Sequence, residues 1–180
     1  MPGVARVLWK AFAVGGVILG FFGALVLARR DQAPAPKRIA LIGDSYAVGL
    51  GPELEKLLPT LRGEARSGTN TGQWANRLED GQWGTWLADF RPTTVLVALG
   101  VNDGATPNPE NYRRIVQTLH GLGARVVWIE PPAAVNTAAR PIIASLGVPT
   151  IRATETPLAV DNLHPNSYSS WAQEIAGAIG

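Results

Sequence analysis

The stretch that decides the fold is RIALIGDS, residues 38–45 of the 180-residue chain. Four apolar residues, 39–42, run without a break into Gly43-Asp44-Ser45. A short apolar run with polar bounds predicts a buried strand of a parallel sheet. Ligands of open α/β sheets bind at the carboxyl ends of the strands, so Ser45 is expected where chemistry takes place. Alternatively, Ser45 is only the N-cap of the following helix, because serine is a favoured cap.

Strands and helices are predicted to alternate along the rest of the chain. The pattern predicts strands near 63–67, 94–99, 125–129 and 148–152, and helices over 47–58, 73–90 (interrupted near Gly81 and Gly84), 109–122, 137–146 and from Pro165 to the end. The first helix is expected to bury one face, made of Leu50, Leu54, Leu57 and Leu58. This alternation favours right-handed crossovers and an α/β domain whose parallel sheet is covered on both faces.

The N-terminal part of the chain differs from the rest. Residues 11–28 form an uncharged apolar run, flanked by Lys10 and by Arg29-Arg30. This run is long enough to cross a bilayer and exceeds the roughly 7–15 apolar residues of a signal peptide. We therefore expect residues 1–30 to be a retained membrane anchor, with a cleaved signal or a buried helix as alternatives. Residues 31–37 read as a Pro/Ala linker and 38–180 as the domain proper.

Basic residues flank the apolar run on both sides, and a bare count of them leans toward a cytoplasmic C-terminal domain. The very short N-terminal tail and the signal-like layout favour an exported domain. We expect it to be extracytoplasmic, in a periplasm or at a cell surface.

Composition excludes several classes of function. The net charge is +2, and the basic excess lies in residues 1–36, so the domain offers no basic run for a nucleic-acid partner. The chain has no cysteine, which removes disulfides, thiolate catalysis and Cys-ligated metals. No Gly-x-Gly-x-x-Gly follows the first strand and no P-loop occurs, which disfavours nucleotide binding.

A nucleophilic serine needs a base, a group that orients the base, and donors for the oxyanion. Of the two histidines, His120 lies near the end of a predicted helix, where a polar or cationic residue suits the helix dipole. His164 follows Asp161 by three residues in a loop, where the carboxylate can reach the imidazole and set its tautomer. Asn102, after the strand at 94–99, has a side-chain amide that can donate to an oxyanion, although Asn102 and Asp103 also suit a simple turn.

Four ordered motifs make a more specific pattern than any single one. They are Gly43-Asp44-Ser45, Ser67-Gly68-Thr69, Gly100-Val101-Asn102-Asp103 and Asp161-Asn162-Leu163-His164. In this order they resemble the SGNH/GDSL hydrolase family, and the match spans about 37–180. The resemblance implies a flavodoxin-like three-layer α/β/α domain and serine ester hydrolysis without a metal or other cofactor.

The resemblance also implies roles for individual residues. Ser45 would be the nucleophile, His164 the general base and then the acid, and Asp161 the residue that orients His164. The oxyanion would be held by the backbone N–H groups of Ser45 and Gly68 and by the Asn102 side chain. Asp44 and Asp103 would be hydrogen-bonding residues behind these groups. Gly72 competes with Gly68 for the second motif, but Gly68 fits better because it comes directly after the predicted strand.

Three functions follow as hypotheses. The first is an anchored esterase that removes small O-acyl groups, such as acetyl, from a cell-envelope carbohydrate. The second is the same chemistry on a lipid, as a lysophospholipase or thioesterase, with Trp74, Trp83 and Trp86 as a possible pocket lining; ordinary helix packing is the favoured interpretation of these tryptophans. The third is an inactive binding or scaffolding domain, which the intact Ser45, Asp161 and His164 disfavour.

Overall fold

The computed structural model describes residues 36–132, 134, 135, 138–152 and 157–179. The chain divides between Pro36 and Lys37, and all described elements lie in the second unit, Lys37–Gly180. The predicted anchor, residues 1–30, and all but the last two residues of the predicted linker lie outside the described residues. None of the helices in the described part of the chain has both the length and the apolar character needed to cross a bilayer.

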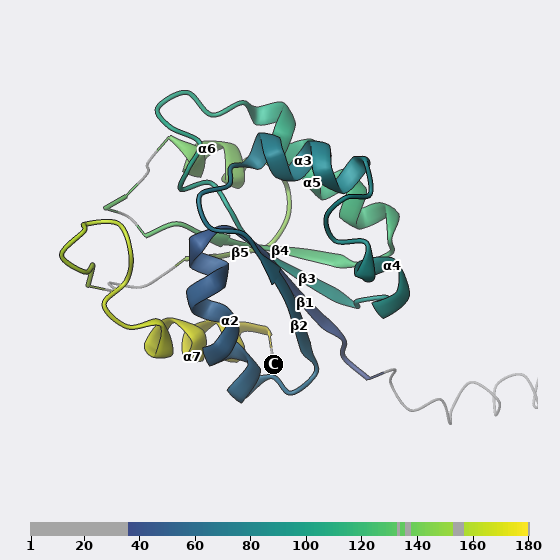
Figure 1. Cartoon of the computed structure of the whole chain (residues 1–180), viewed down its shortest axis with the longest axis horizontal. Helices are drawn as coiled ribbons and strands as arrows, with labels where there is room; N and C mark the ends of the chain where they lie inside the picture. The colour runs from purple at the N-terminus through teal and green to yellow at the C-terminus, as the bar shows by residue number, and fades with distance from the viewer. Residues whose placement is uncertain (1–35, 133, 136–137, 153–156, 180) are drawn as a thin grey trace, which may run out of the picture. The chain divides into compact units, whose positions relative to one another are not determined.

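Five parallel strands form the centre of the domain, in the order β2-β1-β3-β4-β5 (Figure 1). This is the flavodoxin-like order, so the predicted parallel α/β sheet is confirmed. Along the chain the elements are β1 (Ile39–Gly43), α2 (Ser45–Leu57), β2 (Leu61–Ala65), α3 (Thr71–Glu79), α4 (Trp86–Phe90), β3 (Thr94–Ala98), α5 (Pro109–Gly121), β4 (Arg125–Glu130), α6 (Ala139–Ala144), β5 (Thr150–Arg152) and α7 (Tyr168–Ile179).

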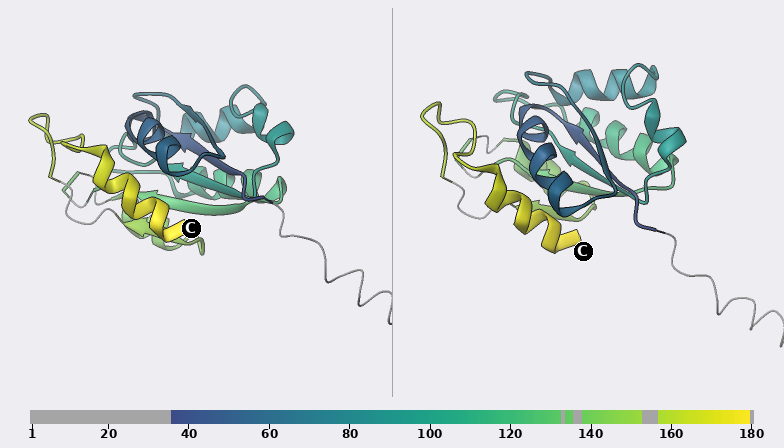
Figure 2. Two further views of the ribbon diagram at one scale, coloured as in Figure 1. Left: turned by 90° about the horizontal axis from the view of Figure 1, so that it is seen from below. Right: turned by 60° about the horizontal axis from the view of Figure 1, so that its bottom comes forward.

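The strands bury alternate residues in two separate cores. Ala40 and Ile42 of β1 face a core shared with α3, α4, α5 and α6, which we call the α3–α6 core. Leu41, between them, faces a second core shared with α2 and α7, the α2/α7 core. This alternation follows from the two-residue repeat of a strand, and the helices lie on the two faces of the sheet in Figure 2.

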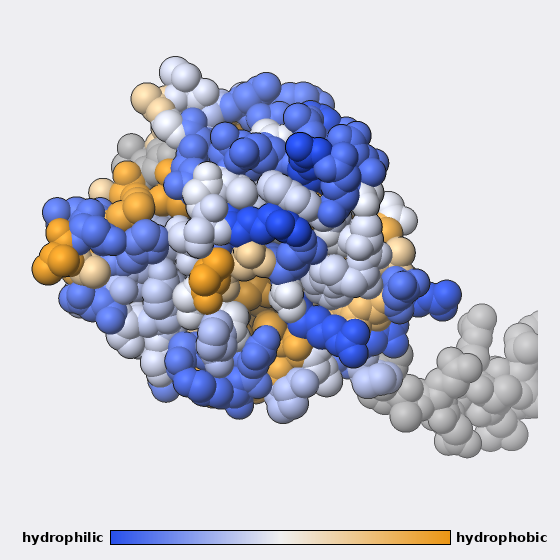
Figure 3. Space-filling view, viewed as in Figure 1, coloured by the Kyte–Doolittle hydropathy of each residue, from blue (hydrophilic) through white to orange (hydrophobic). Residues whose placement is uncertain are grey.

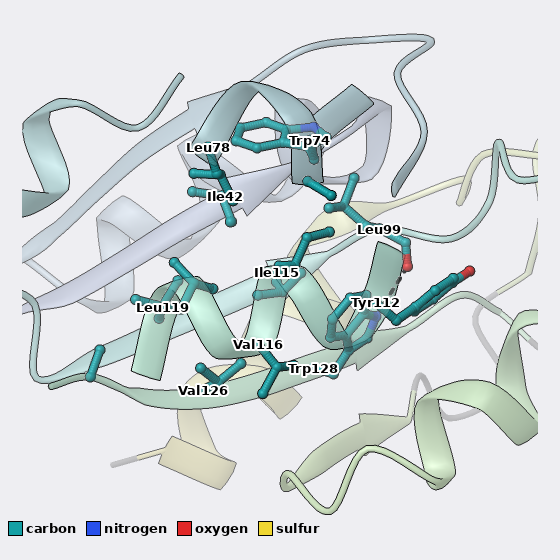
Figure 4. Close-up of a cluster of buried hydrophobic side chains, with 14 of the residues drawn as sticks. Ile42, Trp74, Leu78, Leu99, Tyr112, Ile115, Val116, Leu119, Val126 and Trp128 are labelled. Atoms are coloured by element: carbon teal, nitrogen blue, oxygen red, sulfur yellow. Dashed lines mark hydrogen bonds between the residues drawn. The ribbon is translucent and has the colours of Figure 1, made fainter. Parts of the chain in front are cut away.

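The α3–α6 core is rich in aromatic side chains (Figure 4). Tyr112 of α5 stacks on Trp128 of β4 with ring centroids 5.3 Å apart. The Trp128 indole N–H donates to the Leu99 carbonyl at 3.1 Å, so its polar atom is satisfied inside the core. Trp74 is also fully buried here, and Trp83 and Trp86 pack against the cluster. For these tryptophans the structure therefore agrees with ordinary core packing.

Glycine is required at the end of β1. A Cβ on Gly43 would lie 2.2 Å from the Ala98 carbonyl oxygen of the neighbouring β3. That separation is far below any real contact, so a larger residue would push β1 and β3 apart just before Ser45. The glycine of the first motif thus has a structural reason in the close approach of two strands.

Two details of the predicted helices were wrong. Leu57 is 43% exposed, because the chain turns after α2 and packs Leu58 against the α2/α7 core in its place. The last helix begins at Tyr168 instead of Pro165. Pro165 forms a β-bridge with Leu158, and the Asn166 N–H donates to the Pro157 carbonyl at 2.8 Å, so these residues close a loop before the helix.

Candidate active site

Ser45 lies at the carboxyl edge of the sheet, in the first turn of α2. The N-cap of α2 is Asp44, whose Oδ1 accepts from the Tyr46 N–H at 3.0 Å. The alternative that Ser45 serves as the cap is therefore wrong. Because Asp44 caps the helix, the Ser45 hydroxyl is left for other partners.

Ser45, His164 and Asp161 form a continuous hydrogen-bonded chain. Ser45 Oγ lies 2.9 Å from His164 Nε2, across 119 residues of sequence. His164 Nδ1 lies 2.7 Å from Asp161 Oδ2. The Asp161 carboxylate can only accept a hydrogen bond, so Nδ1 carries the proton of the neutral imidazole. Nε2 is then the acceptor for the Ser45 hydroxyl. The structure thus brings together all three residues predicted for a triad.

The Asp161 carboxylate also shapes the loop that carries His164. Its Oδ1 accepts from the N–H groups of Leu163 and His164, each at 3.0 Å. Asn162 between them has φ 54°, a left-handed conformation that asparagine tolerates better than most residues. The hydrogen bond with the His164 ring, followed by these two backbone donors, lowers the pKa of Asp161 to about 2. The carboxylate is therefore ionised at neutral pH.

Tyr46 fixes the histidine loop from α2. Its hydroxyl donates to the Leu163 carbonyl at 2.9 Å, and its ring meets the His164 ring edge-on with centroids 5.9 Å apart. Tyr46 also packs edge-on against Trp171 of α7. Tyr46 is not predicted from the motifs, because its position beside Ser45 in the sequence does not indicate a contact with His164, 118 residues later.

The loops after β2 and β3 meet at the same edge of the sheet as Ser45. Asn102 Nδ2 donates to the Thr69 carbonyl at 2.9 Å, which joins the two loops. Gly68 has φ 74°, the left-handed region that favours glycine, and among the described residues other than its chain neighbours no atom lies within 4 Å of where its Cβ would be. Gly72, the competing residue, lies in the first turn of α3. The predicted oxyanion groups thus sit on adjoining loops, and their roles remain predictions.

Hydrogen bonds from the α3–α6 side hold these loops. The Trp74 indole N–H donates to Thr69 Oγ1 at 3.0 Å. Asp103 accepts from the Thr71 N–H at 2.8 Å, from the Thr71 hydroxyl and from the Tyr112 hydroxyl. Asp103 therefore ties the loop after β3 to α3 and α5, as a residue behind the site would.

Asp44 is the buried acid of the site. Its exposed fraction is 0%, and within the described residues its Oδ2 has no hydrogen-bond partner. Burial raises the pKa of Asp44 to about 7; the Tyr46 N–H opposes this rise and the negative charge of Asp103 adds to it. Asp44 and Asp103 are thus neighbouring carboxylates in different environments. Asp44 is fully buried, whereas Asp103 accepts hydrogen bonds from Thr71 and Tyr112.

Other predicted features lie away from this edge. His120 is exposed in the last turn of α5, consistent with a structural position at a helix end. In the described part of the chain, no group of three or more His, Asp or Glu residues is arranged to hold a metal ion. The absence of a metal or cofactor from the predicted reaction stays a prediction.

The fold matches solved structures of SGNH hydrolases. A candidate SGNH hydrolase from Slackia heliotrinireducens superposes with a TM-score of 0.62 at 19% identity, covering 80% of this chain and 99% of that one. The esterase EstA from Pseudoalteromonas sp., inhibited by monoethylphosphonate, gives 0.60 at 19%, covering 79% and 97%. The C-terminal catalytic domain of the peptidoglycan O-acetyltransferase OatA from Streptococcus pneumoniae gives 0.53 at 20%, covering 80% and 90%. No family model matches the sequence, and no curated protein matches it. At this identity the likeness shows a shared fold.

Proposed function

We propose that this chain is a serine ester hydrolase with Ser45 as nucleophile, His164 as general base and acid, and Asp161 as the residue that orients His164. The observation that carries the proposal is the unbroken chain of hydrogen bonds from Ser45 Oγ through both nitrogens of the His164 ring to Asp161 Oδ2. Such a chain is what an otherwise weak serine nucleophile requires.

The proposed reaction has two halves. Ser45 Oγ attacks the ester carbonyl while His164 Nε2 takes its proton, and the resulting imidazolium is stabilised by the Asp161 carboxylate, whose lowered pKa keeps it charged. The tetrahedral oxyanion is held by the N–H groups of Ser45 and Gly68 and by the Asn102 amide. His164 then protonates the leaving alcohol, and an acyl-serine forms. In the second half a water molecule, activated by His164, releases the acid and restores Ser45.

We propose small O-acyl groups, such as acetyl, on a cell-envelope carbohydrate as the substrate. The site is open, since the His164 side chain is 33% and the Asp161 side chain 47% exposed, and an open site can admit a bulky glycan that carries a short acyl group. The proposal also draws on the predicted anchor and short linker, which would hold the domain near the envelope, and on the peptidoglycan acetyltransferase among the similar structures.

A lipid ester is the second candidate, as for a lysophospholipase or thioesterase. Two exposed apolar residues flank the triad: Val48, three residues after Ser45, is 45% exposed, and Val160, just before Asp161, is fully exposed. Such residues offer contacts to an acyl chain. On the face shown in Figure 3, however, apolar residues lie in small separate groups among polar ones, which favours the small-acyl substrate.

Covalent labelling tests the enzyme proposal. The domain 37–180 is treated with a serine-directed organophosphonate, and the adduct is located by peptide mass spectrometry. We expect one adduct on Ser45, hydrolysis of p-nitrophenyl acetate by the wild type, and neither in Ser45→Ala. An unlabelled Ser45 together with no hydrolysis would reject the enzyme and favour a binding or scaffolding domain.

Chain-length preference then separates the two substrates. Acetyl and octanoyl esters of p-nitrophenol are compared by kcat/KM, in the wild type and in Val160→Ser. We expect the acetyl ester to be preferred and Val160→Ser to leave that preference unchanged. A strong preference for octanoyl that Val160→Ser weakens would replace the carbohydrate substrate with a lipid.

We further propose that residues 11–28 are retained as a membrane anchor and that the domain is extracytoplasmic. The anchor is supported by the length of the uncharged run and its basic flanks, and the extracytoplasmic placement by the signal-like layout of this segment. Membrane fractionation with intact-mass measurement distinguishes anchor from cleaved signal, since cleavage would remove about 28 residues. Protease added to intact cells or spheroplasts should degrade the domain; protection until lysis would place it on the cytoplasmic side.

A further inference from the structure

Arginines mark the sheet edge opposite Ser45. Arg38 directly precedes β1, Arg62 is the second residue of β2, Arg91 precedes β3 by three residues, and Arg125 begins β4. Since these strands are all parallel (Figure 1), their first residues meet at one edge. We call Arg38, Arg62, Arg91 and Arg125 the basic edge.

Contacts confirm that the four arginines are neighbours. Arg38 Nε donates to the Arg91 carbonyl at 2.7 Å. The Arg125 N–H donates to the Thr93 carbonyl at 3.0 Å, and the Thr93 N–H donates to the Arg38 carbonyl at 2.8 Å. The Arg62 guanidinium lies 5.1 Å from the ring centroid of Phe90, the residue before Arg91. These contacts place the four residues at one end of the sheet.

These arginines differ from other cations of the domain. Arg66, Arg114 and Arg152, for example, each form an ion pair with a glutamate. Among the described residues, no carboxylate forms an ion pair with any of the four arginines of the basic edge. Arg62, Arg91 and Arg125 are also exposed. Like charges gathered at one end of the sheet without carboxylate partners repel one another, and an anionic partner would offset that repulsion.

The surrounding residues leave the edge positive. Two exposed carboxylates lie nearby: Asp89, next to Phe90 in sequence, and Glu55, which lines the same surface hollow as Arg62. Lys37 adds a further positive charge, and its Nζ donates to the Ile179 carbonyl at 3.4 Å, at the end of α7. Arg38, Arg62, Arg91 and Arg125 thus outnumber the two carboxylates, Asp89 and Glu55, that we place beside them among the described residues.

We infer that the basic edge docks on the anionic headgroups of the membrane in which residues 11–28 are anchored. The inference rests on the anchor stated under the proposed function. A membrane is the favoured partner because the chain enters the domain at this edge: Lys37, next to Arg38, is joined in sequence to the apolar run by a linker of about seven residues. Each arginine held near an anionic surface strengthens the contact about fivefold.

This docking sets the direction in which the active site faces. The strands run from the basic edge to the edge that carries Ser45, and five strand residues span about 16 Å. With the basic edge on the headgroups, Ser45 opens away from the bilayer. The substrate then comes from the aqueous side, which fits an envelope carbohydrate better than a lipid of the anchoring membrane.

Fluorescence quenching in the full chain tests the orientation. Because the chain has no cysteine, a single label can be placed at exposed Thr60, beside the basic edge, or at exposed Ala105, in the loop after β3 at the active-site edge. Thr60→Cys and Ala105→Cys are labelled and reconstituted into phosphatidylcholine vesicles with or without about 30% phosphatidylglycerol, doped with a headgroup quencher. We expect strong quenching of the Thr60 label on anionic vesicles and little quenching of the Ala105 label.

Charge variants provide the control. Arg62→Gln, Arg91→Gln and Arg125→Gln together should abolish the extra quenching caused by phosphatidylglycerol, as should about 0.5 M salt. Arg113→Gln, which removes an exposed arginine from α5 that pairs with Glu110, should not. Equal quenching at the two positions, or quenching of the Thr60 label that ignores anionic lipid, would overturn the inference. If inorganic phosphate added at constant ionic strength removed the quenching of the Thr60 label, the inference would also be overturned. The basic edge would then be assigned to a soluble anionic ligand. Failure of the chain to float with vesicles at all would instead reject the anchor.

Discussion

At the scale of single residues, Asn102 is the group whose proposed role is most easily isolated. Its amide donates to the Thr69 carbonyl and still carries a second N–H for an oxyanion. We expect Asn102→Ala to lower kcat for p-nitrophenyl acetate by about 10²–10³, with an unchanged circular dichroism spectrum. Asn108, which caps α5 through a bond to the Glu110 N–H, is the matched control. Asn108→Ala should cost about 1 kcal/mol of stability without changing kcat. A wild-type rate in Asn102→Ala would rule out the oxyanion role.

Asp44 gives a prediction about pH and stability. Its pKa is near 3.8 in the unfolded chain and about 7 in the folded domain, so between these values the unfolded state has lost a proton that the folded state keeps. The contribution of Asp44 to the free energy of unfolding is therefore fully present below its pKa in the unfolded chain. It is lost as the pH rises through its pKa in the folded domain. Asp44→Asn keeps a favoured N-cap and removes the titration.

The measurement is urea unfolding of wild type and Asp44→Asn across this range. Relative to wild type, Asp44→Asn should gain up to about 4 kcal/mol in the free energy of unfolding from about pH 4 to about pH 8. The comparison isolates one group because all other titrations are common to both proteins. A stability difference that stays constant with pH would mean that Asp44 is ionised in the folded domain throughout.

At the scale of elements, the packing of α2 on α7 depends on one glycine. A Cβ on Gly49 would lie 2.2 Å from Cζ of Tyr168, whereas a Cβ on Gly51, two residues later, meets only Leu41 Cδ2 at 3.9 Å. Gly49→Ala should destabilise the domain by about 1–3 kcal/mol, because the Tyr168 ring must move. Gly51→Ala should be neutral or stabilising by up to about 1 kcal/mol, because alanine favours a helix.

Urea unfolding of both variants checks this difference. Tyr168 also lies near the site, since burial and then the charges of Asp44 and Asp161 raise the pKa of its hydroxyl to about 12. Gly49→Ala is therefore expected to slow ester hydrolysis as well, while Gly51→Ala is not. Equal free energies of unfolding for the two variants would show that α7 accommodates the added methyl group with no loss of stability.

At the scale of the whole domain, the two faces of one sheet pack into two separate cores. Leu96 of β3 is buried in the α2/α7 core and Leu119 of α5 in the α3–α6 core, both 0% exposed. Loss of either core frees the strands that the other needs, so the domain should unfold in one transition. Leu96→Ala and Leu119→Ala should each cost about 2–5 kcal/mol, and Leu57→Ala, at an exposed position, little.

Circular dichroism and tryptophan fluorescence give independent readings of this transition. The two signals are expected to change at the same urea concentration in both core variants. Separate transitions in either variant would mean that the two layers fold independently. A single transition would also link the two halves of the site, because the Ser45 side rests on one core and the Asp103 side on the other.

The sequence by itself determined the features that depend on short-range patterns. Apolar runs and polar bounds located β1, β3 and β4, and the spacing of Tyr112, Ile115 and Leu119 located α5 almost to the residue. The motifs around Ser45, Asn102 and His164 named the residues of the candidate site, because each motif lies within a few residues at a strand end or in a loop.

Only the tertiary structure decided the contacts between distant segments. It placed His164 Nε2 2.9 Å from Ser45 Oγ, brought Tyr46 against the His164 ring, left Leu57 exposed and turned Pro165 into part of a loop. It also gathered four arginines, which lie in or just before the starts of four strands, at one edge. The physical reason is range: periodicity and capping act over a few residues, whereas these contacts form only when helices pack on a sheet and bring together residues from distant parts of the chain.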